Sequence, residues 1–162
     1  MITITRRSVR QLRTVFRQAL NLSSRGPAPA ISFVAGPDGM RARASSGDAA
    51  VECHRPGDHP IEQIAAPSEF LSDCEGRKDD PVTLELRGDR QIIVQWRDGS
   101  VPQMVQYDAA EPVDSARFPR LPEELAENAP AILAALRDAA ETTEPAAFRY
   151  ATNCIQLRGT AG

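Results

Sequence analysis

Residues 2–22 read ITITRRSVRQLRTVFRQALNL, and the spacing of the apolar residues changes once within this stretch. Ile2 to Thr5 alternates apolar and polar residues, as a half-buried strand does. From residue 8 to residue 22 the apolar residues recur every three or four positions and so share one face of a helix. The stretch therefore predicts a short strand that leads directly into an amphipathic helix.

Three further strands are expected after this helix, at residues 31–34, 40–45 and 51–54. Turn-forming residues separate them: Gly36-Pro37-Asp38-Gly39 precedes the second strand and Gly47-Asp48 precedes the third. In the second of these strands the alternation places Arg41 and Arg43 on the outward face.

The same order returns between residues 61 and 107. The pattern predicts a strand at 61–65, a short helix at 67–75, and strands at 82–86, 91–96 and 101–107. Asp98-Gly99 is a strong hairpin signal, and Pro102 indicates an edge position or a bulge in the last strand. Two units of strand, helix and three strands predict an α+β fold, with two helices packed on one side of antiparallel sheet.

A third unit begins but does not finish. Residues 108–128 are acidic and contain prolines, which is typical of a linker. A helix is expected from Pro130 to about Thr143, with Asn128 as its cap, and a strand from 148 to 157. Because one helix and one strand cannot bury their apolar faces alone, we expect that the natural protein continues beyond residue 162 or that this chain is a truncated product.

Composition excludes several classes of protein. Of the 162 residues, 41% are hydrophobic and 25% charged, and no apolar run approaches the roughly 20 residues that cross a bilayer. The charged residues near the N-terminus follow the apolar ones, the reverse of a signal peptide, which predicts a cytoplasmic protein. The three cysteines, Cys53, Cys74 and Cys154, are odd in number and widely spaced and form no C-x-x-C motif, which argues against a zinc knuckle or a disulfide framework.

The distribution of charge is more informative than its sum. The net charge is −3, yet the first 37 residues contain six arginines and no Asp or Glu, so that segment carries +6. Arg10, Arg13 and Arg17 recur at spacings of three and four on one face of the first helix. A solvated face usually mixes charges of both signs. The stripe therefore indicates an anion-binding surface, with a merely solvated helix face as the alternative.

Short segments along most of the chain resemble bacterial DNA polymerase III β sliding clamps. The resemblance lies in the order and spacing of five segments: Pro27 to Ile31, Ser46-Gly47-Asp48, Ala66 to Leu71 followed by Cys74, Arg117 to Leu121, and Ile155 to Gly159. It implies the DNA-clamp fold, with residues 1–121 as a first clamp domain and residues 122–162 as a linker and the incomplete start of a second.

The resemblance also implies a function. A sliding clamp encircles duplex DNA and tethers the replicative polymerase through phosphate contacts that do not depend on base sequence. The implied partners are the DNA backbone, the polymerase, the clamp loader and further copies of the protein in a ring, as a homodimer. No enzymatic activity, cofactor, metal or membrane is implied. The residues expected to contact DNA are Arg10, Arg13, Arg17 and Arg25.

Departures from the clamp pattern leave alternatives open. The second helix carries Glu69, Asp73 and Glu75, whereas a helix that faces DNA should favour positive charge. A clamp-like adaptor that binds proteins without encircling DNA is therefore a rival hypothesis. A small α+β enzyme is a weaker one, because only the loop pair Asp79-Asp80 resembles catalytic carboxylates. A metal site at Cys53, His54, Asp58 and His59 is also disfavoured, because neighbouring strand residues point to opposite faces.

Overall fold

Strand β1 (Ile2–Thr5) and helix α1 (Arg6–Ala19) follow directly on one another in the computed structural model. The hydroxyl oxygen of Thr5 accepts a hydrogen bond from the backbone N–H of Ser8 at 3.1 Å and so caps the helix. The helix ends earlier than residue 22, because Asn21 adopts a left-handed conformation with φ of 48°. The predicted strand and helix are both confirmed, with the helix shifted towards the N-terminus.

The structure describes residues 1–22, 28–88, 90–114, 118–120, 127, 129–143 and 155. The chain divides into two compact units, Met1–Arg120 and Leu121–Gly162. Whether residues 1–121 form one clamp domain, as the sequence suggests, stays a prediction.

In the described part of the chain, eight strands form two four-stranded antiparallel sheets, consistent with the α+β fold expected from the sequence. One sheet has the order β4-β3-β2-β5 and the other has the order β1-β6-β7-β8. The bounds are β2 (Ile31–Gly36), β3 (Gly39–Ser46), β4 (Ala49–Arg55), β5 (Glu62–Ala66), β6 (Pro81–Arg87), β7 (Gln91–Asp98) and β8 (Val101–Asp108). All eight lie where the alternation predicts strands.

The two repeats exchange their first strands. β1 pairs with β6 of the second repeat, with Ile2 opposite Leu84 and Ile4 opposite Val82. β5, the first strand of the second repeat, pairs in turn with β2 of the first repeat. Each sheet therefore contains three strands of one repeat and one strand of the other, which makes the two repeats a single folding unit.

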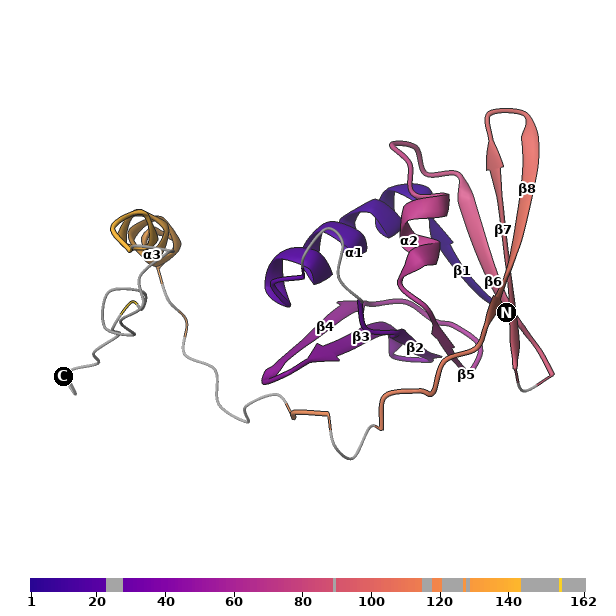
Figure 1. Ribbon diagram of the computed structural model, residues 1–162, viewed down its shortest axis with the longest axis horizontal. Coiled ribbons are helices and arrows are strands. Elements are labelled where there is room, and N and C mark those ends of the chain that lie inside the picture. Colours follow the sequence, from indigo (N-terminus) through magenta and orange to yellow (C-terminus); the bar gives the residue numbers. More distant parts are fainter. Residues whose placement is uncertain are drawn as a thin grey trace. The chain divides into compact units, whose positions relative to one another are not determined.

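Helix α2 (Glu69–Cys74) lies beside α1, and both pack against the same core (Figure 1). Its buried residues are Phe70, Leu71 and Cys74. The predicted helix at 67–75 is confirmed, although Pro67 and Ser68 precede its first regular turn. The two helices are neighbours, as the repeated element order predicts.

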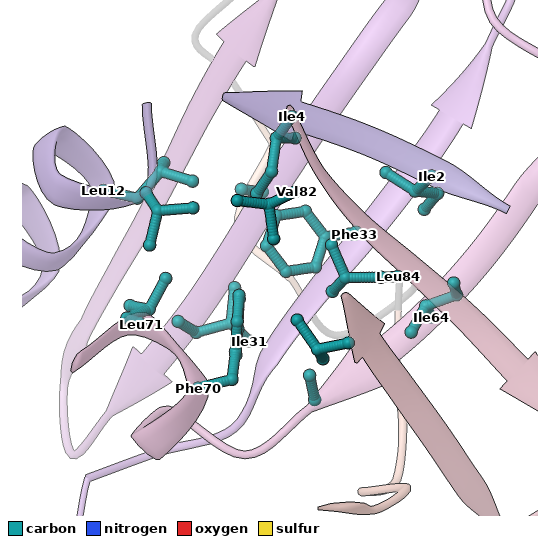
Figure 2. Packing of buried hydrophobic residues seen from close by; sticks show 14 of the residues in the cluster. Ile2, Ile4, Leu12, Ile31, Phe33, Ile64, Phe70, Leu71, Val82 and Leu84 are labelled. Atoms are coloured by element: carbon teal, nitrogen blue, oxygen red, sulfur yellow. The ribbon is translucent and has the colours of Figure 1, made fainter. Parts of the chain in front are cut away.

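The core forms where the inner faces of both sheets meet the two helices. Figure 2 shows Ile2, Val82 and Leu84 of one sheet close to Phe33 and Ile64 of the other. The rings of Phe33 and Phe70 are both fully buried, and their centroids lie 5.8 Å apart in an edge-to-face arrangement. On β3 the alternation buries Met40, Ala42 and Ala44, whereas Arg41 and Arg43 point outward, as predicted.

The segment that follows β8 is docked on the sheets where the structure describes it. The backbone N–H of Ala110 donates to the carbonyl of Ala65 at 2.9 Å, and that of Val113 donates to the hydroxyl of Ser32 at 2.7 Å. The guanidinium carbon of Arg43 lies 5.0 Å from the ring centroid of Phe118. The described residues at the start of the predicted linker therefore belong to the first unit. Pro102 lies in β8, an edge strand, as its sequence position predicts.

Helix α3 (Ala131–Glu141) follows Pro130 at the expected position in the second unit. None of its residues is buried, and the side chains of Ile132 and Leu133 are exposed. The predicted cap Asn128 and, apart from Ile155, the predicted strand at 148–157 lie outside the described residues. Among the helices that the structure describes, none is long and apolar enough to span a membrane.

Candidate nucleic-acid interface

Helix α1 presents a row of arginines on the side of the helix next to its buried face. Val9, Leu12 and Phe16 point into the core, and their burial fixes the rotation of the helix. Residues three and four positions apart are neighbours on a helix surface, so Arg10, Arg13 and Arg17 form one continuous row. The helix contains no acidic residue. Any counter-charge must therefore come from elsewhere in the fold.

The first two arginines of the helix are engaged in holding the fold together. The guanidinium of Arg6 donates to the carbonyl oxygens of Cys74, Glu75 and Arg97 and to the carboxylate of Asp98. Arg7 donates to the carbonyl of Arg77 at 3.2 Å and forms an ion pair with Asp79 at 3.2 Å. Asp79, the residue that could imitate a catalytic carboxylate, is therefore an ion-pair partner at the helix start.

Arg13 lies in the middle of the row and is paired with an acidic residue. Its Nη1 donates to Oε1 of Glu75 at 2.6 Å, and the two side chains are 34% and 30% exposed. Glu75 directly follows α2, so this ion pair also joins the two helices. Of the residues expected to contact DNA that the structure describes, Arg13 is thus the one with a competing partner.

Arg10 and Arg17 have no such partner in the described part of the chain. Both side chains are exposed, and no hydrogen bond or ion pair within the described ranges involves either guanidinium. They stand on either side of Arg13 along the helix. Arg25, the fourth predicted contact, lies outside the described residues. Two of the four predicted residues therefore present an unpaired positive charge on the helix surface.

The neighbouring helix α2 makes the surface mixed in charge. Glu69 and Asp73 are exposed on it, and Asp73 accepts a hydrogen bond from the hydroxyl of Tyr107 at 2.6 Å. Burial and this hydrogen bond to a carboxylate both raise the pKa of Tyr107, so the phenol stays neutral. The bond ties the edge strand β8 to α2. Positive charge is consequently concentrated on α1, as the sequence indicates.

A hollow of about 190 Å³ lies between the C-terminal part of α1 and α2. Its floor is apolar and includes Phe16, Ile31 and Leu71, and Arg13 and Arg17 line it as well. The hollow is smaller than the roughly 300–1,000 Å³ of common small-molecule sites. The charged row, and not this hollow, is therefore the main feature of the surface.

The cysteines of the first unit are not poised for chemistry. Cys74 is fully buried, and desolvation, helped by the neighbouring Asp73, raises the pKa of its thiol to about 12. Burial, and then Glu52, raise the pKa of Cys53. The described residues contain no group of three or more His, Cys, Asp or Glu side chains that could hold a metal ion. His54 instead lies 3.0 Å from the carbonyl of Asp38 through its Nε2.

Comparison with known proteins relates this architecture to solved structures. No protein-family model and no curated protein matches the chain. The Helicobacter pylori β clamp bound to a DNA ligase peptide aligns with a TM-score of 0.60 and 15% identity, covering 91% of this chain. The β subunit of DNA polymerase III from Pseudomonas aeruginosa aligns with a TM-score of 0.60 and 12% identity over 94% of the chain. This chain has the fold of the bacterial β clamp.

The β-clamp fold is recognised here over only part of the proteins compared. The DNA polymerase β subunit of Streptococcus pyogenes, with a TM-score of 0.52 and 16% identity, covers 78% of this chain. The chain spans 33% to 42% of the length of these three clamp structures. The expected clamp fold is confirmed, with its repeated unit and its two neighbouring helices.

Sequence reasoning missed the acidic partners of the arginines. Glu75, Asp79 and Asp98 lie 62 to 92 residues from the arginines that they contact. The sequence correctly predicts that α1 itself carries a row of arginines and no acidic residue. It contains no information on which distant carboxylates the fold brings to the helix.

Proposed function

We propose that this chain is part of a DNA sliding clamp, a processivity factor that encircles duplex DNA and tethers a replicative polymerase. The exposed guanidiniums of Arg10 and Arg17 on α1, which have no partner among the described residues, carry the proposal together with the β-clamp fold. A ring holds DNA by its closed topology, so it needs only weak contacts that permit sliding. Arginine contacts to phosphate are of this kind, because phosphates carry no base information.

The proposed DNA-contacting residues are Arg10, Arg13, Arg17 and Arg25, all on or just after the first helix. The proposed partners are the duplex DNA backbone, the replicative polymerase, the clamp loader and further copies of the protein in a ring. A cytoplasmic location belongs to the same proposal, and no catalytic role is assigned to the chain.

A salt titration of duplex DNA binding by the complete ring that contains this chain tests the proposal. Each phosphate neutralised adds about 0.9 to the slope of log affinity against log salt. Changing Arg10 and Arg17 together to Ala should therefore lower the slope by roughly 1 to 2, equally for duplexes of unrelated sequence. The matched control is Arg87→Ala with Arg90→Ala, which removes the same charge from exposed positions around the β6–β7 turn. Equal slopes in wild type and in the α1 variant would contradict the proposal.

A clamp-like adaptor that binds proteins and not DNA is the second candidate. The observation that favours it is the acidic α2, whose exposed Glu69 lines the same hollow as Arg13 and Arg17 and whose following residue, Glu75, pairs with Arg13. Such an adaptor should show no DNA binding at low salt, or binding that does not change with salt concentration. The same titration therefore distinguishes the two functions.

A further inference from the structure

Glu75 is held in place from two sides. Its carbonyl oxygen accepts a hydrogen bond from Nη2 of Arg6 at 2.9 Å, and the N–H of the next residue, Gly76, donates to the carbonyl of Arg6 at 3.1 Å. These bonds fix the backbone of Glu75 against the start of α1. Its carboxylate is thereby positioned at Arg13, where the donor and acceptor atoms are 2.6 Å apart. The contact is a consequence of the fold and not of two flexible side chains meeting by chance.

The pair remains accessible to a third group. Arg13 and Glu75 are each about one-third exposed, whereas the side chain of Arg6, enclosed by three carbonyls, is only 14% exposed. Arg13 also belongs to the row that contains the unpaired Arg10 and Arg17. An anion that reaches those two arginines along the helix therefore approaches Arg13 as well.

We infer that Glu75 is an internal competitor of DNA phosphate for Arg13, and that it sets the strength of the DNA contact made by α1. The inference rests on the proposed function. A carboxylate and a phosphate oxygen accept the same kind of charge-assisted hydrogen bond from a guanidinium, so they compete for it directly. Arg10 and Arg17 bind phosphate without first losing another partner. Arg13 becomes a contact only when a phosphate displaces Glu75.

The competition has a measurable consequence for counterion release. With Arg13 held by Glu75, DNA binding neutralises fewer phosphates than the three arginines of the row could neutralise. Removing the charge of Glu75 leaves Arg13 available, so binding should neutralise about one phosphate more. The slope of log affinity against log salt should then become steeper by about 0.9. A weaker contact in the natural protein favours sliding over tight binding.

The variant Glu75→Gln tests this inference, because it removes the charge and keeps the size of the side chain. The matched control is Glu69→Gln, which removes an equal charge from an exposed position on α2 without an ion pair among the described residues. We expect the steeper slope for Glu75→Gln and not for Glu69→Gln. Thermal unfolding of each variant verifies that the fold is retained.

Testing Glu75→Gln in a second variant, Arg13→Ala, identifies the residue through which Glu75 acts. In a chain that already carries Arg13→Ala, Glu75→Gln should no longer change the salt slope. An equal effect of Glu75→Gln and Glu69→Gln, or an effect that persists without Arg13, would overturn the inference, because the cause would be the general field of the surface. If Glu75→Gln changes nothing while the Arg10/Arg17 variant still lowers the slope, the inference fails and the proposed function stands. Absence of DNA binding by the complete wild-type ring overturns both.

Discussion

The guanidinium of Arg6 donates a hydrogen bond to Oδ1 of Asp98 at 3.0 Å, although 92 residues separate them in the chain. The same guanidinium reaches carbonyl oxygens at the end of α2 and at Arg97 of β7. One side chain thus joins the start of α1 to two elements of the second repeat, α2 and β7. This contact depends on the shape of the planar, five-donor guanidinium, which can serve several acceptors at once.

The first prediction is that Arg6→Ala lowers the free energy of unfolding by about 2–3 kcal/mol, because it leaves partly buried carbonyls without a donor. The measurement is chemical denaturation. The neighbouring Arg7 is the control: its side chain and that of Asp79 are 56% and 61% exposed, so Arg7→Ala should cost no more than about 1 kcal/mol. Equal losses for the two variants would show that Arg6 is an ordinary surface charge.

Gly39 at the β2–β3 turn is predicted not to tolerate a side chain. Its φ is +123°, and a Cβ there would lie 2.3 Å from the carbonyl oxygen of Arg55. Gly39→Ala should therefore lower the free energy of unfolding by about 1–3 kcal/mol or more. Gly36 is the matched control, since in the described part of the chain no atom lies within 4 Å of a Cβ built there. Gly36→Ala should change stability by less than about 1 kcal/mol, and a comparable loss at both glycines would refute the steric explanation.

A third prediction concerns alkaline pH. Burial raises the pKa of Cys74 from 9.0 to about 12 in the folded chain, so the fold favours the neutral thiol. A raised folded pKa contributes stability that is complete below pH 9 and is lost as the pH rises towards 12. Between about pH 8 and about pH 10 the wild type should lose about 1.4 kcal/mol more than Cys74→Ala. Urea denaturation of both proteins at both pH values measures this difference. An equal loss of stability in wild type and in Cys74→Ala would show that ionisation of Cys74 does not destabilise the fold.

Docking of the segment after β8 should depend on one buried hydroxyl. Ser32 is 1% exposed and accepts a hydrogen bond from the N–H of Val113 at 2.7 Å. Ser32→Ala removes this acceptor, so the amide hydrogen of Val113 should exchange with solvent about ten times faster. Ser45→Ala, at an exposed position on β3, should leave that exchange rate unchanged. No change in the rate for Ser32→Ala would mean that other contacts hold the segment.

Much of the order of strands and helices can be predicted from the local spacing of apolar residues, as β1 and α1 show. Ile2 and Ile4 alternate with threonines, and Val9, Leu12 and Phe16 follow a helical spacing, so backbone geometry alone separates β1 from α1. The ends of elements are less predictable, because they depend on single contacts. The hydroxyl of Thr5 starts α1 two residues early, and the conformation of Asn21 ends it three residues early.

In the candidate site, too, one part could be predicted from local spacing and another part depends on the tertiary structure. The spacing of Arg10, Arg13 and Arg17 places them on one helix face whatever the rest of the fold does. Which of them remains unpaired depends on Glu75, which lies 62 residues from Arg13 in the chain and reaches it only because α2 lies beside α1. Charge pairing depends on distance in space, and local sequence contains no such distance.

The exchange of first strands between the repeats also depends on the tertiary structure and not on the local sequence pattern. The alternation of apolar and polar residues predicts an apolar face for β1 and for β5, but it does not predict which strand will pair with each of them. Hydrogen bonds between strands form between any two backbones of matching register, so the partner is chosen by how side chains pack. Ile2 lies opposite Leu84 and Ile4 opposite Val82, and all four side chains are buried in a core built from both repeats, which only the tertiary structure brings together.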